Sequence, residues 1–213
     1  MKKIVFALSL IALALSAGIF FSMSQVKKRN TPLPYHDGDV IFQASNSRQC
    51  EAVKLATHSD ISHCGILFQQ NNSWFILEAV EPVSIIRLDQ FIARGIGGHY
   101  QIKRLKPEFN SLDSIKTKAM FSLGHSWIAR HYDIFFNWGY GELYCSELVW
   151  KLYHDAAGID LCSLKTLRDY DLNAPLVKQM MAERYGREIP YQENMIAPSD
   201  ISSSEKMMLV EER

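Results

Sequence analysis

The chain has 213 residues, of which 47% are hydrophobic and 22% are charged, and its 23 acidic and 23 basic side chains give a formal net charge of zero. This composition excludes wholesale disorder, and the length of residues 31–213 fits one domain with a sizeable core. The charge balance argues against a general nucleic-acid binder, which normally carries a basic excess.

The first thirty residues differ in character from the rest of the chain. Two lysines precede an uncharged apolar run from Ile4 to Phe21, and a basic cluster at 27–29 follows it. This is the layout of a secretory signal that is cleaved after Ala17 or Ser24. The run is also close to the length of a membrane span, so an uncleaved N-terminal anchor is the alternative. We favour export, which predicts a periplasmic protein, with membrane association through this segment where it is retained.

Residues 26–36 are expected to form an extended tether, and the chain then alternates between short strands and helices. In chain order the first part of the domain is predicted to contain a strand at 40–44, a helix capped at residue 46 or 47 and running to about 57, strands at 62–69, 74–80 and 83–88, a short helix at 90–94, and a strand at 100–105.

The second part of the domain is predicted to be mainly helical. A helix opened by residue 111 or 113 ends at Gly124 and is expected to bury one apolar face, made of Leu112, Ile115, Ala119 and Leu123. After an aromatic, loop-like stretch, helices are expected at 145–158, 164–170 and 175–185, followed by an irregular tail that frays over 202–213. The whole pattern indicates an α+β fold, a small antiparallel sheet with helices at both ends.

Two of the predicted strands flank a good tight-turn pair, Asn71-Asn72, and therefore form a hairpin. A two-residue turn sets Gly65 opposite Glu78, which puts His63 and Glu78 on one face as diagonal neighbours, roughly 7–8 Å apart at the backbone. Hydrophobic residues surround both, and a charged Glu78 inside such a strand needs a partner.

A cysteine, Cys145, stands where a helical pattern begins, directly after a Gly-rich aromatic run. With Ser146 or the stretch just before it as the N-cap, Cys145 lies at or beside the first turn. Free backbone N–H groups and the positive end of the helix dipole favour a thiolate over a thiol at that place. The alternative is that Cys145 is a small buried hydrophobe, the commonest fate of a free cysteine.

A thiolate nucleophile needs a base, and histidine is the default because it titrates near neutrality. Of seven histidines, only His63 lies in a strand interior with a carboxylate, Glu78, projected onto its face. A structural histidine is the alternative. A zinc site made of His58, His63, Cys64 and Glu78 lacks the usual zinc spacings, and the chain has neither a Gly-x-Ser-x-Gly elbow nor a phosphate loop. We therefore expect no metal and no cofactor.

The four cysteines, Cys50, Cys64, Cys145 and Cys162, could form two bridges in three ways. Their density is too low for a fold built on disulfides. If Cys145 is a nucleophile it must stay free, which leaves a Cys50–Cys64 bridge open.

Four motifs occur in a specific order, at Thr57–Gly65, Leu77–Val80, Tyr132-Asp133 and Tyr144–Glu147. Together they closely resemble the YiiX-type permuted papain-like hydrolases of the NlpC-type cysteine hydrolase superfamily, over a region from about residue 38 to 186. The resemblance implies a circularly permuted papain core, in which the histidine strand and a polar-residue strand precede the cysteine helix.

Carried over by position, the resemblance makes Cys145 the nucleophile, His63 the base, and Glu78 the group that orients the histidine. These are the residues that the helix start and the strand parity also select. Tyr144 is a candidate for shaping the oxyanion region, with a core tyrosine as the alternative.

We also expect specific roles for two further residues of these motifs. Asp133 is expected either to fix its loop or to bind a substrate amine. Cys64, a second thiol beside the histidine, departs from the pattern and suggests a redox-sensitive site.

The predicted reaction is hydrolysis of an amide or peptide bond through a thioacyl-enzyme, with the oxyanion stabilised at the helix start. The resemblance implies substrates of two classes, since relatives in this superfamily cut cell-wall peptides and others move acyl chains between lipids. Export favours a peptide or amide of the cell envelope. A lipid acyltransferase or esterase with the same triad and a non-catalytic envelope binding module are the alternatives.

Overall fold

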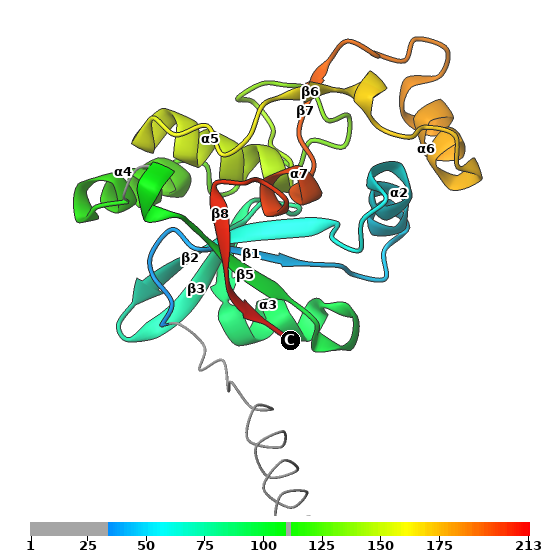
Figure 1. The fold of residues 1–213 in the computed structure, drawn as a ribbon. Coiled ribbons are helices and arrows are strands. Elements are labelled where there is room, and N and C mark those ends of the chain that lie inside the picture. Colours follow the sequence, from blue (N-terminus) through cyan, green and yellow to red (C-terminus); the bar gives the residue numbers. More distant parts are fainter. Residues whose placement is uncertain (1–33, 110–111) are drawn as a thin grey trace, which may run out of the picture. The chain divides into compact units, whose positions relative to one another are not determined.

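The structure, a computed structural model, describes residues 34–109 and 112–213, so the predicted signal or anchor segment lies outside the described residues. Its centre is a six-stranded sheet in the order β4-β3-β2-β1-β5-β8, with antiparallel neighbours throughout (Figure 1). The strands of this sheet are β1 (Val40–Gln43), β2 (His63–Gln70), β3 (Ser73–Glu78), β4 (Ser84–Arg87), β5 (Gln101–Leu105) and β8 (Met207–Glu212). Two short strands, β6 (Lys165–Thr166) and β7 (Asn194–Met195), pair separately.

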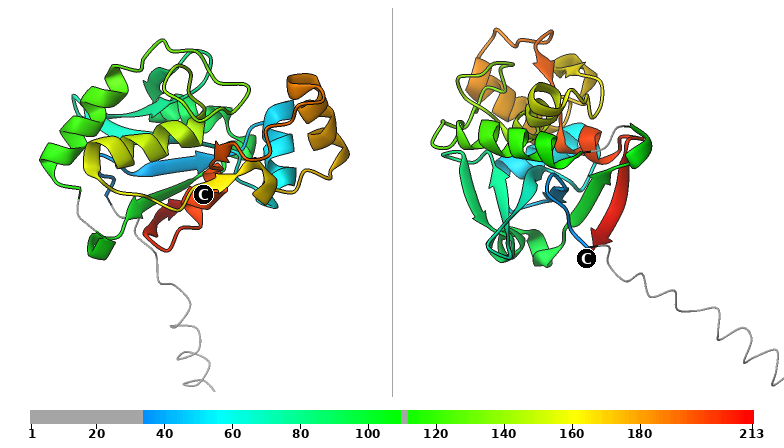
Figure 2. Two further views of the ribbon diagram at one scale, coloured as in Figure 1. Left: turned by 90° about the horizontal axis from the view of Figure 1, so that it is seen from above. Right: turned by 90° about the vertical axis from the view of Figure 1, so that its left-hand side faces the viewer.

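Helices cover both faces of the sheet and one of its ends (Figure 2). The α-helices are α2 (Arg48–Thr57), α3 (Leu88–Arg94), α4 (Ser114–His125), α5 (Cys145–Ala157), α6 (Pro175–Tyr185) and α7 (Pro198–Ser202). Three single turns of 3₁₀-helix are η1 (Ile96–Gly98), η2 (Pro107–Phe109) and η3 (Leu167–Asp169). Among the described residues, no helix has the length and apolar character needed to cross a bilayer. The architecture is α+β, as the sequence predicts.

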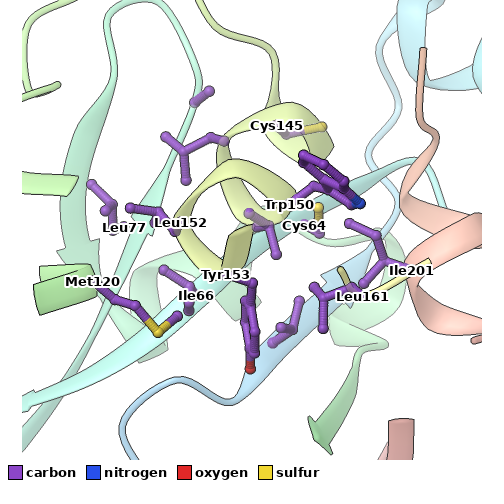
Figure 3. Packing of buried hydrophobic residues seen from close by; sticks show 14 of the residues in the cluster. Cys64, Ile66, Leu77, Met120, Cys145, Trp150, Leu152, Tyr153, Leu161 and Ile201 are labelled. Carbon is purple, nitrogen blue, oxygen red and sulfur yellow. The ribbon is translucent and has the colours of Figure 1, made fainter. Parts of the chain in front are cut away.

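The sheet is buried on both faces because successive side chains of a strand point to opposite sides. Ile66 of β2 belongs to the large cluster formed with α4 and α5, whereas the next residue, Leu67, belongs to a smaller cluster with Phe91 of α3. Figure 3 shows the first of these clusters beneath α5. A third cluster joins α2 to α6.

The β2–β3 hairpin has the predicted register. Ile66 pairs with Leu77, and Gln70 pairs with Ser73 across the turn. Asn71 and Asn72 both have positive φ, 48° and 61°, the backbone conformation that a two-residue hairpin turn requires. The parity that places His63 and Glu78 on one face is therefore confirmed.

The C-terminal tail contradicts the prediction that residues 202–213 fray. Residues Met207–Glu212 form β8, which pairs with β5 and completes the sheet. The order of this segment comes from a partner strand about a hundred residues earlier, which the local sequence pattern does not reveal.

One helical prediction is wrong, and a second holds only in part. Residues 164–170 form strand β6 and one 3₁₀ turn, because Lys165 and Thr166 pair with β7. On the predicted buried face of α4, Leu112 and Leu123 pack against the large cluster, but Ile115 is 77% exposed, and the residues that the helix buries fully are Thr117, Met120 and Gly124. A Cβ at Gly124 would lie 2.2 Å from the Leu77 side chain, so the close approach of backbone to sheet selects this face.

Candidate active site

The hairpin and helix α3 hold a histidine and a carboxylate together. The His63 Nε2–H donates to Glu78 Oε2 at 2.6 Å, and Glu78 Oε1 accepts from Arg94 of α3. The His63 ring stacks on Phe91, also of α3, with ring centroids 5.6 Å apart. Glu78 is fully buried, and a buried carboxylate requires such partners. Strand register brings His63 and Glu78 together, and α3 fixes both.

Cys145 is the first residue of α5, and its side chain is 4% exposed. Extended backbone at the N-cap, Tyr144, begins the helix, and the Tyr144 N–H donates to Glu147 at 3.3 Å. The Cys145 sulfur interacts electrostatically with His63 and with Cys64, and both interactions lower its pKa. Because His63 Nε2 is bound to Glu78, Nδ1 is the ring nitrogen left for the sulfur.

The charges of Cys145 and His63 stabilise each other. The neighbouring Cys64 thiol lowers the pKa of Cys145 well below its usual range, and attraction to His63 lowers it further, against the opposing effect of burial. Burial lowers the pKa of His63, but its interactions with Cys145 and with Glu78 outweigh this effect and raise the pKa to about 10. The two shifts together favour a thiolate beside an imidazolium over the neutral pair.

Tyr132 is a site residue whose role the sequence did not indicate. Its hydroxyl accepts a hydrogen bond from Gln49 Nε2 at 2.7 Å, and Arg184 of α6 donates to Gln49 Oε1 at 2.7 Å. Burial and the charge of Cys145 raise the pKa of Tyr132, so its hydroxyl proton is retained beside the sulfur. Its motif was recognisable, but the contact with Cys145 depends on how residues 125–144 fold.

The structure places the other two candidates at the edge of the site. The Tyr144 hydroxyl accepts the N–H of Ile196 at 3.2 Å, and its ring lies edge-on to Phe136. Both oxygens of Asp133 accept loop N–H groups, from Phe135 at 2.8 Å and Asn137 at 2.7 Å. Asp133 is 2% exposed and makes the loop contacts that were one of its two expected roles.

Two cavities flank the sulfur and the imidazole. An apolar cavity reaches from Cys145 between α2 and α6 and is lined mainly by aliphatic and methionine side chains, among them Ala52, Val53, Val177, Met180, Met181 and Met195. A second, more polar cavity opens at His63 and is lined by groups such as Gln43, Ser45, Ser47, Glu81 and Arg94. Gln49, Ser62 and Tyr132 line both cavities.

All four cysteines are free thiols, so the Cys50–Cys64 bridge that the sequence left open is not formed. Within residues 34–109 and 112–213, no group of three or more His, Cys, Asp or Glu side chains could hold a metal ion.

A β-sheet whose histidine strand precedes the cysteine helix is the papain core in permuted order. A family model described as permuted papain-like amidase enzyme, YaeF/YiiX, C92 family, matches residues 34–211. The chain belongs to this family, and at that level it is a papain-like cysteine hydrolase.

Two relatives show how close the match is. The chain is 35% identical to the uncharacterized protein YiiX of Escherichia coli K12 over 173 residues, which are 81% of this chain and 84% of that protein. It also resembles the crystal structure of metalloprotein yiiX from Escherichia coli O157:H7, with a TM-score of 0.79 and 35% identity over 84% of this chain and 97% of the other. The donor groups described above do not fit a metal centre in this chain, so no step is assigned to one.

Proposed function

We propose that the protein is an amidase that uses Cys145 as nucleophile, His63 as acid and base, and Glu78 as the group that orients His63. The hydrogen-bonded line from Arg94 through Glu78 to His63, whose charge and that of the Cys145 sulfur stabilise each other, carries this proposal. A purely structural thiol does not need a neighbouring imidazolium, whereas a nucleophile at neutral pH does.

The reaction divides into two steps. The Cys145 thiolate attacks the carbonyl carbon, and the His63 Nδ1–H gives its proton to the leaving nitrogen, so that the amine departs and a thioester remains. His63 then takes a proton from water, the hydroxide attacks the thioester, and the acid leaves with the thiolate restored. Glu78 keeps the ring in one orientation throughout.

The negative charge on the carbonyl oxygen requires donors in both steps. The first backbone N–H groups of α5, which begins at Cys145, lack partners within the helix and can supply such donors, and the positive end of the helix dipole adds to their effect. A side chain can also donate to this oxygen. The Tyr132 hydroxyl accepts a hydrogen bond from Gln49 and keeps its own proton for a second partner. We assign Tyr132 as the side-chain donor and place Tyr144 beside it as part of the cavity wall.

For the substrate we propose an amide or peptide of the cell envelope. The proposal rests on the sequence of residues 1–30, which has the layout of a secretory signal or an anchor and implies a periplasmic domain over residues 31–213. The two steps proposed above use neither a metal nor a cofactor.

The apolar cavity favours a second candidate. A cavity lined by methionine and aliphatic side chains directly beside the nucleophile suits a hydrophobic acyl group, because burying apolar surface there is favourable. A lipid amide or ester would then be the acyl donor, and the thioester could pass its acyl group to an alcohol or amine in place of water.

Acyl-enzyme formation tests both candidates. The purified full chain is incubated with envelope peptides and with N-acyl amides and esters of increasing chain length, and its intact mass and the released amine or alcohol are measured. We expect an adduct on Cys145 that is absent in Cys145→Ala and present in the matched thiol variant Cys162→Ala. A product that forms only with an added alcohol or amine acceptor would favour acyl transfer. Unchanged biological function of Cys145→Ala, with no adduct, would support a binding module.

A further inference from the structure

One cation faces the apolar cavity beside the nucleophile. Arg184, in the last turn of α6, lines this cavity together with Cys145. Among the described residues it is the only arginine, lysine, histidine or carboxylate side chain in the cavity wall, which otherwise consists of apolar, hydroxyl and amide groups. A charge in such surroundings requires a partner, because an unpaired charge is costly to bury.

Two contacts hold the Arg184 guanidinium in the cavity wall. One of its terminal nitrogens donates to Gln49 Oε1 of α2 at 2.7 Å, and the guanidinium carbon lies 4.8 Å from the centre of the Phe136 ring. Gln49 and Phe136 line the same cavity, and Gln49 also donates to the Tyr132 hydroxyl at 2.7 Å. The hydrogen bond to Gln49 uses one of the five N–H groups of the guanidinium, so the contacts orient Arg184 and leave donors for another group.

No carboxylate within residues 34–109 and 112–213 forms an ion pair with Arg184. The adjacent Glu183 binds Arg48 of α2 through both of its oxygens, at 2.7 and 2.8 Å. The charge of Asp133 also acts on Arg184, but both oxygens of Asp133 accept loop N–H groups. Burial lowers the pKa of Arg184, although a guanidinium stays protonated at neutral pH. An anion brought into the cavity would therefore stabilise this charge.

We propose that Arg184 binds a carboxylate of the substrate, carried on an apolar acyl chain that occupies the cavity. This assignment rests on the proposed function and names the class of acyl donor, an amide whose acyl portion ends in a carboxylate. The parallel N–H groups of a guanidinium match the two oxygens of a carboxylate. A phosphate dianion carries more charge, and the described wall of the cavity holds no second cation to balance it.

The test is the binding of matched probes to the full chain with Cys145→Ala, measured by isothermal titration calorimetry so that no probe is turned over. The probes are monoamides of α,ω-dicarboxylic acids of several chain lengths and the corresponding diamides, in which a neutral carboxamide replaces the carboxylate. Monoalkyl phosphates of the same lengths test the competing anion.

Three arginine variants are added to the same protein. Arg184→Met removes the charge at similar length, and Arg184→Lys keeps the charge without the planar fork. Arg48→Met is the matched control, because Arg48 also joins α2 to α6 but does not line the cavity. A merely structural role of Arg184 in joining the two helices would lower the affinity for both probes alike.

With Arg184 present, we expect the monoamide to bind at least about tenfold more tightly than the diamide of the same length, because hydrogen bonds between charged groups are the stronger ones. Arg184→Met should bind the two probes equally, Arg184→Lys should keep part of the preference, and Arg48→Met should keep all of it.

Equal binding of the monoamide and the diamide, no binding of either, or a preference that survives Arg184→Met would overturn the assignment. Tighter binding of the alkyl phosphate would overturn the choice of a carboxylate. The comparison of probes with Arg184 intact needs no arginine variant, so it decides the question even if Arg184→Met does not fold. The proposed function fails separately, when the chain with Cys145 intact forms no adduct with any acyl donor.

Discussion

Two fully buried carboxylates, Glu78 and Glu147, differ in the groups that they bind. Glu78 of β3 binds His63 and Arg94, whereas Glu147 of α5 binds Lys151 and two backbone N–H groups. Both are 0% exposed. The partner of Glu78 is a ring whose proton can move to a substrate, and the partners of Glu147 are fixed structural groups.

The surroundings of Glu147 explain why it is structural. Lys151 is 1% exposed, lies 2.6 Å from Glu147, and has its ammonium over the rings of Trp138 and Tyr140. Together these groups tie the aromatic loop to the helix that begins with Cys145. Burial alone therefore does not show that a carboxylate has a catalytic role. The chemistry of the group that the carboxylate binds decides this.

The largest effect on catalysis is expected at Glu78. Glu78→Ala should fold, because Arg94 is 44% exposed and can turn to solvent, but kcat/KM should fall by about 10²–10⁴-fold as His63 loses its orientation. Steady-state kinetics measure the loss of activity, and thermal melting shows whether the variant is folded. Near-normal turnover in a folded variant would remove Glu78 from the triad.

The largest effect on stability is expected at Glu147. Glu147→Ala leaves the Lys151 ammonium buried and unpaired, which should lower the free energy of unfolding by about 3–5 kcal/mol. The double variant Glu147→Leu with Lys151→Met should recover most of that loss, because an apolar pair can replace a buried ion pair. Urea denaturation measures both. If the single variant is as stable as the wild type, the comparison between the two carboxylates fails.

The pH profile of kcat/KM tests the coupling of Glu78 to His63. The His63 pKa, raised from 6.5 to about 10, keeps the imidazolium as proton donor up to that pH, while the lowered pKa of Cys145 extends the thiolate to lower pH than an ordinary thiol allows. We expect kcat/KM to be flat through neutrality and to fall about tenfold per unit above about pH 10. In Glu78→Gln the alkaline limb should move to lower pH, since Glu78 helps to raise the His63 pKa. An unmoved limb would contradict that coupling.

The smallest effect is expected at Arg94. Arg94→Met removes one partner of Glu78 but leaves its bond to His63, so kcat/KM should fall by about tenfold with little change in melting temperature. Arg87→Met is the matched control, because Arg87 is the N-cap of the same short helix and binds Asp89. A loss as large as that of Glu78→Ala would mean that Arg94 itself contacts the substrate.

The sequence predicted those parts of the site that depend on local rules. Strand parity and a two-residue turn place His63 beside Glu78, and a helix start places Cys145 where backbone N–H groups are free. Both rules act over a few residues, so they are readable without the fold.

The parts that were missed depend on contacts distant in sequence. Tyr144 is adjacent to Cys145 in the chain, but its hydroxyl binds the N–H of Ile196. Tyr132, whose backbone forms a bridge with Leu143, lines the same cavity as Cys145. In the same way, strand β8 is ordered by β5 and not by its own pattern.

Activation of Cys145 by His63 can be measured as the iodoacetamide labelling rate of Cys145 against pH in the full chain and in His63→Ala. We expect rapid labelling below pH 7 in the wild type and, in His63→Ala, a rate that rises only near the ordinary thiol pKa of about 8.5. If the wild type is labelled at the pace of an ordinary thiol, or if both proteins have the same profile, His63 does not activate Cys145.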